Sequence, residues 1–248
     1  MTDQTSGSLL RLANPAVFNR LADRVIGPFA VLTLLLFAWG LYGAFFVAPP
    51  DYQQGETIRI MFIHVPAAWM AMFVYAGMSA SALGTLIWRH PMADVALKCA
   101  APLGAGFTLL CLVTGSLWGK PMWGTWWEWD ARMTSVLVMF LIYIGVIALQ
   151  QAIEEPNRAA RAVAILTLVG AVNLPIIKFS VDWWSTLHQP ASVFRIDGPT
   201  IHGSMLGPLF IMGIAFLMLY ITLLMLAMRA EVMNRRAERL ELLAAEAE

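Results

Sequence analysis

Long apolar stretches dominate the chain and alternate with short polar segments. A bilayer core about 30 Å thick needs roughly 20 apolar residues of helix. Five stretches of that length contain no Asp, Glu, Lys or Arg: Val25–Val47, Val65–Trp88, Cys99–Gly119, Met133–Ile153 and Gly203–Met228. The pattern predicts a transmembrane helix at each of these positions.

A sixth stretch, Ala162–Ile177, is shorter and contains Pro175. Arg161 and Lys178 at its ends can extend their charged groups to the interface and lengthen the span. We therefore predict an all-α integral membrane protein with six transmembrane helices. The expected division is a cytoplasmic segment 1–24, a transmembrane domain 25–228 and a charged cytoplasmic tail 229–248. The charge of this tail favours a solvated helix that leaves the bilayer.

Six spans place both termini on one side of the membrane, and the basic residues indicate which side. The tails and the loops after the second and fourth spans contain eleven: Arg11, Arg20, Arg24, Arg89, Lys98, Arg158, Arg161, Arg229, Arg235, Arg236 and Arg239. The other loops contain five: Arg59, Lys120, Arg132, Lys178 and Arg195. By the positive-inside rule the termini are cytoplasmic, and the loops after the first, third and fifth spans face outward.

Composition agrees with this and excludes other classes of protein. Hydrophobic residues make up 59% of the chain and charged residues 13%, whereas soluble proteins have about 25% charged residues. The formal net charge is zero, so no global field attracts nucleic acid. Cys99 and Cys111 lie about 18 Å apart along a helix, too far for a disulfide. No Cys-x-x-Cys-His motif is present for covalent haem attachment.

Tryptophans concentrate on the side predicted to face outward. Trp123, Trp126, Trp127 and Trp129 fall within one short segment, WGTWWEWD. If Trp123 starts a helical turn, Trp126 and Trp127 share its face and form an aromatic shelf. An aromatic belt at the membrane interface is the alternative. Four large rings exceed what anchoring requires, so the shelf favours a large, planar, apolar ligand.

Polar residues follow this tryptophan segment. Asp130 precedes the fourth span, and its simplest role is the N-cap of that helix, with organisation of the tryptophan segment as the alternative. Arg132 is the nearest cation. It can pair with Asp130 or Glu128, or bind a ligand carboxylate through two hydrogen bonds.

None of the four histidines lies in the middle of a predicted span. His64 comes just before the second span, with Pro66 in the first helical turn, and His188 lies in the last outward loop. Both fall on the side of the tryptophans, and two neutral imidazoles are suitable axial ligands for haem iron. His90 is predicted to be cytoplasmic, and His202 is a spare candidate. Arg59, Lys120, Arg132, Lys178 and Arg195 are all available for the haem propionates.

The run WGTWWEWDARMTS resembles the tryptophan-rich WWD signature of membrane proteins that handle haem in cytochrome c biogenesis. Together with IHVPAAW, NLPIIKFSVDWWSTLHQ and six spans, it is similar to the cytochrome c maturation protein C family, or haem exporter C family, over residues 20 to 228. This resemblance implies non-covalent haem b with two histidine ligands, His64 and His188. The segment from Trp123 to Asp130 would be the platform for it.

The resemblance also implies a place in the cell and a set of partners. The chain would lie in the bacterial inner membrane with its haem site facing the periplasm. It would pass haem to a periplasmic haem chaperone, cytochrome c maturation protein E. A small single-span partner, cytochrome c maturation protein D, and an ATP-binding-cassette pair, cytochrome c maturation proteins A and B, would assemble with it. No Walker motif is present, so ATP chemistry belongs to a partner.

Delivery of haem, without enzymatic turnover, is the function these observations favour. A permease that moves haem or another small molecule through the bundle is the first alternative, but the spans contain few midplane polar features beyond Asn173 and Pro175. A quinol-oxidising haem protein is the second, and the absence of intramembrane histidine pairs argues against it.

Overall fold

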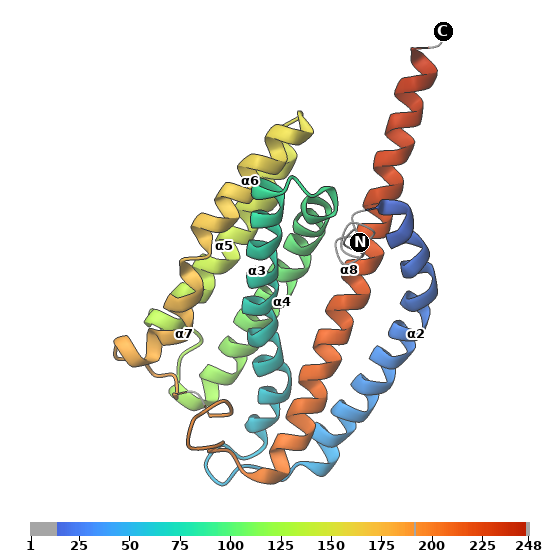
Figure 1. The fold of residues 1–248 in the computed structure, drawn as a ribbon. Coiled ribbons are helices and arrows are strands. Elements are labelled where there is room, and N and C mark those ends of the chain that lie inside the picture. The colour runs from blue at the N-terminus through green and yellow to red at the C-terminus, as the bar shows by residue number, and fades with distance from the viewer. Residues whose placement is uncertain (1–13, 191, 247–248) are drawn as a thin grey trace, which may run out of the picture.

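The structure is a computed structural model that describes residues 14–190 and 192–246, and it is helical throughout its long segments (Figure 1). Within these described ranges, six helical segments are long and apolar enough to cross a membrane: Pro15–Val47, Glu56–Ile87, Pro91–Trp123, Ala131–Ala152, Pro156–Trp183 and Gly203–Ala245. The prediction of an all-α membrane protein with six spans is confirmed. Of the predicted segment 1–24, residues 1–13 lie outside the described part.

The helices follow one another in a simple order. They are α2 (Pro15–Tyr42), α3 (Met61–Ile87), α4 (Pro91–Trp123), α5 (Ala131–Ala152), α6 (Pro156–Gly170), α7 (Asn173–Trp183) and α8 (Gly203–Ala245). A π-helical turn (Gly43–Val47) extends α2, and a 3₁₀ turn (Glu56–Ile60) leads into α3. Because α2 and α8 pass through positions 24 and 228 without a break, the division into a transmembrane domain and two tails stays a prediction.

Prolines and polar caps set the helix starts, which lie ahead of several apolar stretches. Pro15, Pro91 and Pro156 begin α2, α4 and α6, where a missing N–H costs nothing. The Asp130 side chain accepts a hydrogen bond from the Met133 N–H at the start of α5. The N-cap role predicted for Asp130 is therefore confirmed.

The fifth span, predicted from the stretch Ala162–Ile177 as a single span, is not one continuous helix. It breaks at Ala171 and Val172 into α6 and α7. In an unbroken helix the Pro175 ring would collide with the carbonyl of Ala171, four residues earlier. With the break, Pro175 lies in the first turn of α7, where proline is tolerated.

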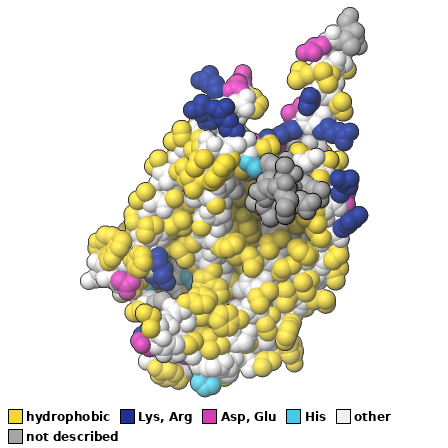
Figure 2. All heavy atoms as spheres, viewed as in Figure 1, with side chains coloured by type: hydrophobic (Ala, Val, Ile, Leu, Met, Phe, Trp, Pro, Cys, Tyr) yellow, Lys and Arg dark blue, Asp and Glu magenta, His cyan; other side chains and the backbone are white. Residues whose placement is uncertain are grey.

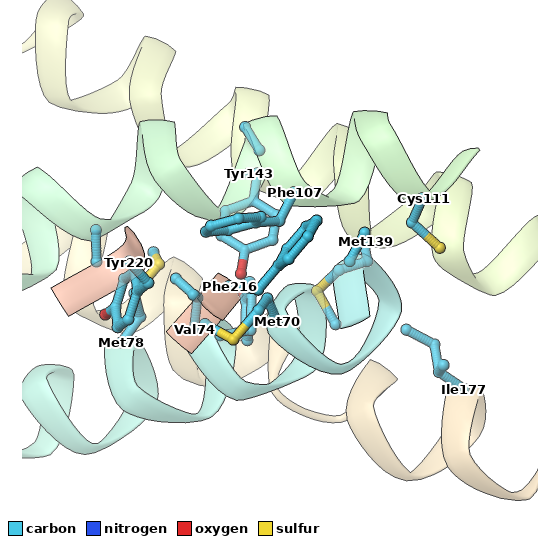
Figure 3. Packing of buried hydrophobic residues seen from close by; sticks show 14 of the residues in the cluster. Met70, Val74, Met78, Phe107, Cys111, Met139, Tyr143, Ile177, Phe216 and Tyr220 are labelled. Atoms are coloured by element: carbon cyan, nitrogen blue, oxygen red, sulfur yellow. The ribbon is translucent and has the colours of Figure 1, made fainter. Parts of the chain in front are cut away.

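Aromatic and sulfur-containing side chains fill the centre of the bundle (Figure 3). Tyr75, Tyr143 and Met78 are fully buried. Tyr75 donates to the Thr167 carbonyl at 3.1 Å, and Tyr143 donates to the Ala71 carbonyl at 2.9 Å. These bonds tie α3 to α6 and α5, and they leave a tightly packed layer halfway along the bundle.

The two ends of the bundle differ in composition. The start of α2 and the end of α8 lie at one end, which we call the terminal end (Figure 1). The connections 48–55 and 124–130 and the described residues of the connection 184–202 lie at the other, which we call the loop end. Lys and Arg side chains gather at the terminal end, and a broad apolar band covers the middle (Figure 2). By the positive-inside rule the loop end is predicted to face outward.

Candidate functional site

A cavity of about 450 Å³ opens at the loop end between α3, α4, α5, α7 and the connection 184–202. This volume lies within the usual range of small-molecule sites. His64 from α3 and His188 from the 184–202 connection both line it, with Trp123 and Arg132. Two imidazoles that are 124 residues apart in sequence therefore share one cavity.

His64 lies inside α3, because the helix begins at Met61. The prediction that His64 precedes the span, with Pro66 in the first turn, is wrong, because the 3₁₀ turn Glu56–Ile60 starts the helical segment earlier. The His64 Nδ1 atom lies 3.1 Å from the Cys111 carbonyl oxygen and 3.2 Å from Thr114 Oγ1. Thr114 donates its own proton to the Leu110 carbonyl. Both neighbours thus accept from Nδ1–H, and Nε2 keeps its lone pair.

Close approach of α4 supports the His64 ring. A Cβ atom on Gly115 would lie 3.0 Å from His64 Cε1, so a side chain there would crowd the imidazole. The Trp118 ring meets His64 edge-on at 5.7 Å between centroids, and its Nε1–H donates to Gln54 Oε1 at 2.9 Å. Sequence reasoning missed Gly115 and Gln54, since neither belongs to a motif.

Asp130 holds the second histidine. His188 Nδ1 lies 2.8 Å from Asp130 Oδ2, which also accepts from the Thr186 hydroxyl at 2.6 Å. Asp130 Oδ1 accepts from the Met133 N–H at 2.7 Å. Asp130, the N-cap of α5, therefore also orients the His188 ring. The Nδ1–H of His188 donates a hydrogen bond to the carboxylate, and Nε2 remains free.

Burial and hydrogen bonding shift the pKa values of this pair. Burial alone would raise the pKa of Asp130, but the hydrogen bonds from Thr186, Met133 and His188 outweigh it and hold that pKa below its usual value. Burial lowers the pKa of His188, and Arg132 acts in the same direction, against the opposing effect of Asp130. His188 is therefore a neutral imidazole beside an ionised carboxylate at neutral pH.

The tryptophans do not form the predicted helical shelf. Gly124 adopts a left-handed φ of 78° and ends α4 directly after Trp123, so residues 124–130 are not helical. The Trp123 ring meets His188 edge-on at 4.9 Å between centroids. Trp126 and Trp129 are 55% and 73% exposed, and half-buried Trp127 packs edge-on against Trp129. The Trp123 ring therefore faces the cavity, and the Trp126 and Trp129 rings face out of the protein.

Arg132 contacts α7 instead of a neighbouring carboxylate. Its Nε–H donates to Ser180 Oγ at 3.2 Å, and Nη2 donates to the Lys178 carbonyl at 3.4 Å. In the described part of the chain it forms no ion pair with Asp130 or Glu128. Of the two roles considered for Arg132, the pairing is not found, and binding of a ligand carboxylate stays a prediction. A guanidinium has five N–H donors, and the others remain available toward the cavity.

The other candidate residues lie elsewhere. His90 precedes α4 at the terminal end, and His202 caps α8 by accepting from the Ser204 N–H. Arg59 donates to the carbonyls of Ala44 and Ala48. Of the five basic residues predicted for the propionates, the cavity lining contains Arg132 and Lys178.

Fold and site together define a multi-pass membrane protein with a ligand-sized cavity at one end. The family model described as Heme exporter protein C matches residues 8–243, and the chain belongs to this family. It is therefore a non-catalytic membrane subunit of the bacterial haem exporter family.

Relatives from three bacteria are similar over most of their length. A protein named Heme exporter protein C from Bradyrhizobium diazoefficiens is 60% identical over 238 residues, covering 96% of this chain and 90% of that protein. The protein of the same name from Haemophilus influenzae is 45% identical, with 92% of each chain covered. That from Escherichia coli strain K12 is also 45% identical, covering 90% of this chain and 89% of the relative.

Proposed function

We propose that this protein binds one haem b non-covalently in the loop-end cavity and delivers it to a periplasmic haem chaperone. His64 and His188 are the axial ligands, each through Nε2. The observation that carries this proposal is that the His64 and His188 rings line one cavity and are hydrogen-bonded in the same way, through Nδ1, so that Nε2 of each ring is free. Each Nδ1 is held by an acceptor, Cys111 O for His64 and Asp130 for His188, and such second contacts are typical of ligating histidines.

The rest of the cavity suits haem as cargo. Apolar side chains such as Trp69, Met72, Val136 and Ile177 cover much of its wall, which favours a large apolar macrocycle. Arg132, with N–H donors to spare, can bind a propionate. Trp123 packs on His188 and supports that ligand from outside the iron site.

By the positive-inside rule we expect the loop end, and with it the cavity, to face outward, and we assign this side to the periplasmic face of the bacterial inner membrane. The exposed rings of Trp126 and Trp129 lie in the connection that contains Asp130, and we assign to them the docking of cytochrome c maturation protein E. The single-span cytochrome c maturation protein D and the ATP-binding-cassette pair, cytochrome c maturation proteins A and B, complete the export system. No Walker motif is present in this chain.

Delivery explains the structure better than a permease does. The buried layer of Tyr75, Tyr143 and Met78 lies across the centre of the bundle. A second, smaller cavity of about 120 Å³, lined by Lys98 and Gln150, lies toward the terminal end. A permease would need to open the hydrogen-bonded layer between the two cavities, whereas delivery needs only the loop end.

Transfer to the chaperone tests this function. Haem-loaded protein in nanodiscs is mixed with the soluble domain of the chaperone, and haem on each protein is followed by absorbance. We expect Trp126→Ala with Trp129→Ala to keep haem but to slow transfer about tenfold or more, as loss of interface tryptophans does. Trp39→Ala, which removes an exposed tryptophan from α2, is the control. Unchanged transfer by the double variant would contradict the docking role, and failure of the wild type to transfer haem would contradict delivery.

A further inference from the structure

The helices around the cavity do not close on one side. In the terminal half of the bundle, α3, α4, α5 and α6 form a closed ring, because α6 packs against both α5 and α3. In the loop half α7 replaces α6. Among the described residues α7 packs on α5 but makes no comparable contact with α3. Between α3 and α7, the cavity is therefore not closed by the packing of one helix against the other.

The break between α6 and α7 produces this divergence. Gly170 at the end of α6 lies so close to α3 that a Cβ there would be 2.1 Å from Tyr75 Oη. Three residues later, Asn173 Nδ2 donates to the Ser135 carbonyl of α5 at 2.8 Å. The chain thus leaves α3 at Gly170 and continues along α5, and α7 runs apart from α3 (Figure 1).

The open side reaches hydrocarbon depth. Met72 lines the cavity eleven residues after the start of α3, a rise of roughly 16 Å, which is about half the bilayer core. Two exposed side chains along this span are apolar, Val172 at the break (65% exposed) and Phe179 of α7 (42% exposed), and the charged Lys178 and Asp182 are exposed in the second half of α7. Figure 2 shows a hollow on this side of the molecule, with cationic side chains at its edge and a histidine within. The opening therefore faces acyl chains.

One aromatic contact crosses the open side. Phe194, from the connection between α7 and α8, lines the cavity and packs on Trp69 of α3, with 5.2 Å between ring centroids. Phe194 is nevertheless 64% exposed, so it lies between the cavity and the surroundings. Phe210 of α8 packs on the same two rings at 6.4 and 6.1 Å but does not line the cavity.

We propose that the gap between α3 and α7 is a lateral entrance through which haem dissolved in the outer leaflet enters the cavity, and that Phe194 is its gate. This inference rests on the proposed function. The macrocycle passes between the apolar edges formed by Trp69, Met72 and Ile177. Lys178, exposed and in the cavity lining, keeps the propionates at the interface. Passage requires the Phe194 ring to leave Trp69.

The test compares two haem donors for the protein in nanodiscs. One donor is haem dissolved in the lipid. The other is haem coupled through one propionate to a soluble carrier protein, which keeps it out of the bilayer. We expect Phe194→Ala to raise the rate of haem uptake from lipid about fivefold, the order set by loss of one aromatic pair. Uptake from the carrier is expected to stay unchanged.

Phe73→Ala is the matched control, because it removes an exposed ring of α3 that packs on Tyr220 and lies outside the cavity lining, and we expect it to leave the rate from lipid unchanged. Equal acceleration from both donors, or none from lipid, would overturn the lateral entrance. Ala68→Trp, which fills the cavity wall on α3, should slow uptake from lipid, with Ala76→Trp on the exposed face as its control. A wild type that binds haem from neither donor would instead overturn the proposed function.

Discussion

At the scale of single residues, Asp130 has two tasks that use different oxygen atoms. Oδ1 accepts the Met133 N–H and begins α5, whereas Oδ2 accepts from Thr186 and His188. The orientation of the His188 imidazole is thereby coupled to the start of a membrane-spanning helix. A rigid helix end is a more accurate support for a ligand than a loop alone.

Substitutions at Asp130 should separate these tasks. Asp130→Asn can keep an oxygen as the N-cap but places an amide where Oδ2 accepted from His188. We expect haem affinity to fall about 10- to 100-fold, as for other residues that orient a ligating histidine, while thermal stability stays near the wild-type value. Asp130→Ala should also lose about 1 kcal/mol of stability with the cap. Haem titration and thermal unfolding in detergent measure both effects, and unchanged affinity in both variants would contradict the coupling.

Several site residues follow from the sequence, and others do not. The predicted side of the membrane and the residue types indicated His64 and His188 as candidate haem ligands and Asp130 as an N-cap. The acceptors of His64 are the Cys111 carbonyl and Thr114 on another helix, and helix pairing is invisible in a hydrophobic pattern. The tryptophan shelf was wrong because Gly124 takes a left-handed conformation and ends the helix, so helical spacing no longer applies after Trp123.

At the scale of elements, the break between α6 and α7 shapes the site. The sequence showed a short span with Pro175 but not that the chain would change neighbours there. Gly170 permits close contact with Tyr75 of α3, and Asn173 then bonds to α5. The existence of a fifth span was predictable from the apolar stretch Ala162–Ile177 together with Arg161 and Lys178 at its ends, whereas its route depends on contacts between helices distant in sequence.

Gly170→Ala tests this packing. Its Cβ would lie 2.1 Å from Tyr75 Oη and 2.8 Å from Ile142 Cγ2, so α6 must shift away from α3. We expect a loss of about 1 to 3 kcal/mol of stability, the usual cost of overpacking, seen as a lower unfolding temperature. Gly145→Ala is the control, because its nearest neighbour, Leu166 Cδ2, is 3.9 Å away. Equal stability of the two variants would show that the contact is not tight.

At the scale of the whole molecule, ion pairs at the terminal end join α8 to the rest of the bundle. Glu231 accepts from Lys98 at 2.7 Å, Arg235 pairs with Asp94 at 2.7 Å, and Arg229 pairs with Asp23 at 2.7 Å. The first turns after position 228 are thus attached to α2 and α4, although the sequence favoured a solvated extension. The later turns project beyond the bundle (Figure 1).

A charge exchange tests this attachment. Glu231→Lys places a cation beside Lys98 and Arg235, and we expect a loss of about 1 kcal/mol, the order for partly exposed pairs. The double variant Lys98→Glu with Glu231→Lys should recover part of that loss. Arg239→Glu, farther along α8, serves as the control. Thermal unfolding at low and high salt measures the effect, and an unaltered transition for Glu231→Lys would contradict it.

Ligation of one haem by two distant histidines is the central claim, and the absorption spectrum of the haem-loaded protein tests it most directly. We expect a six-coordinate, low-spin spectrum for the wild type and for His202→Ala. His64→Ala and His188→Ala should each give a high-spin spectrum or lose haem, and added imidazole should restore the low-spin form where haem is retained. Low-spin spectra identical to the wild type in both single variants would contradict the account.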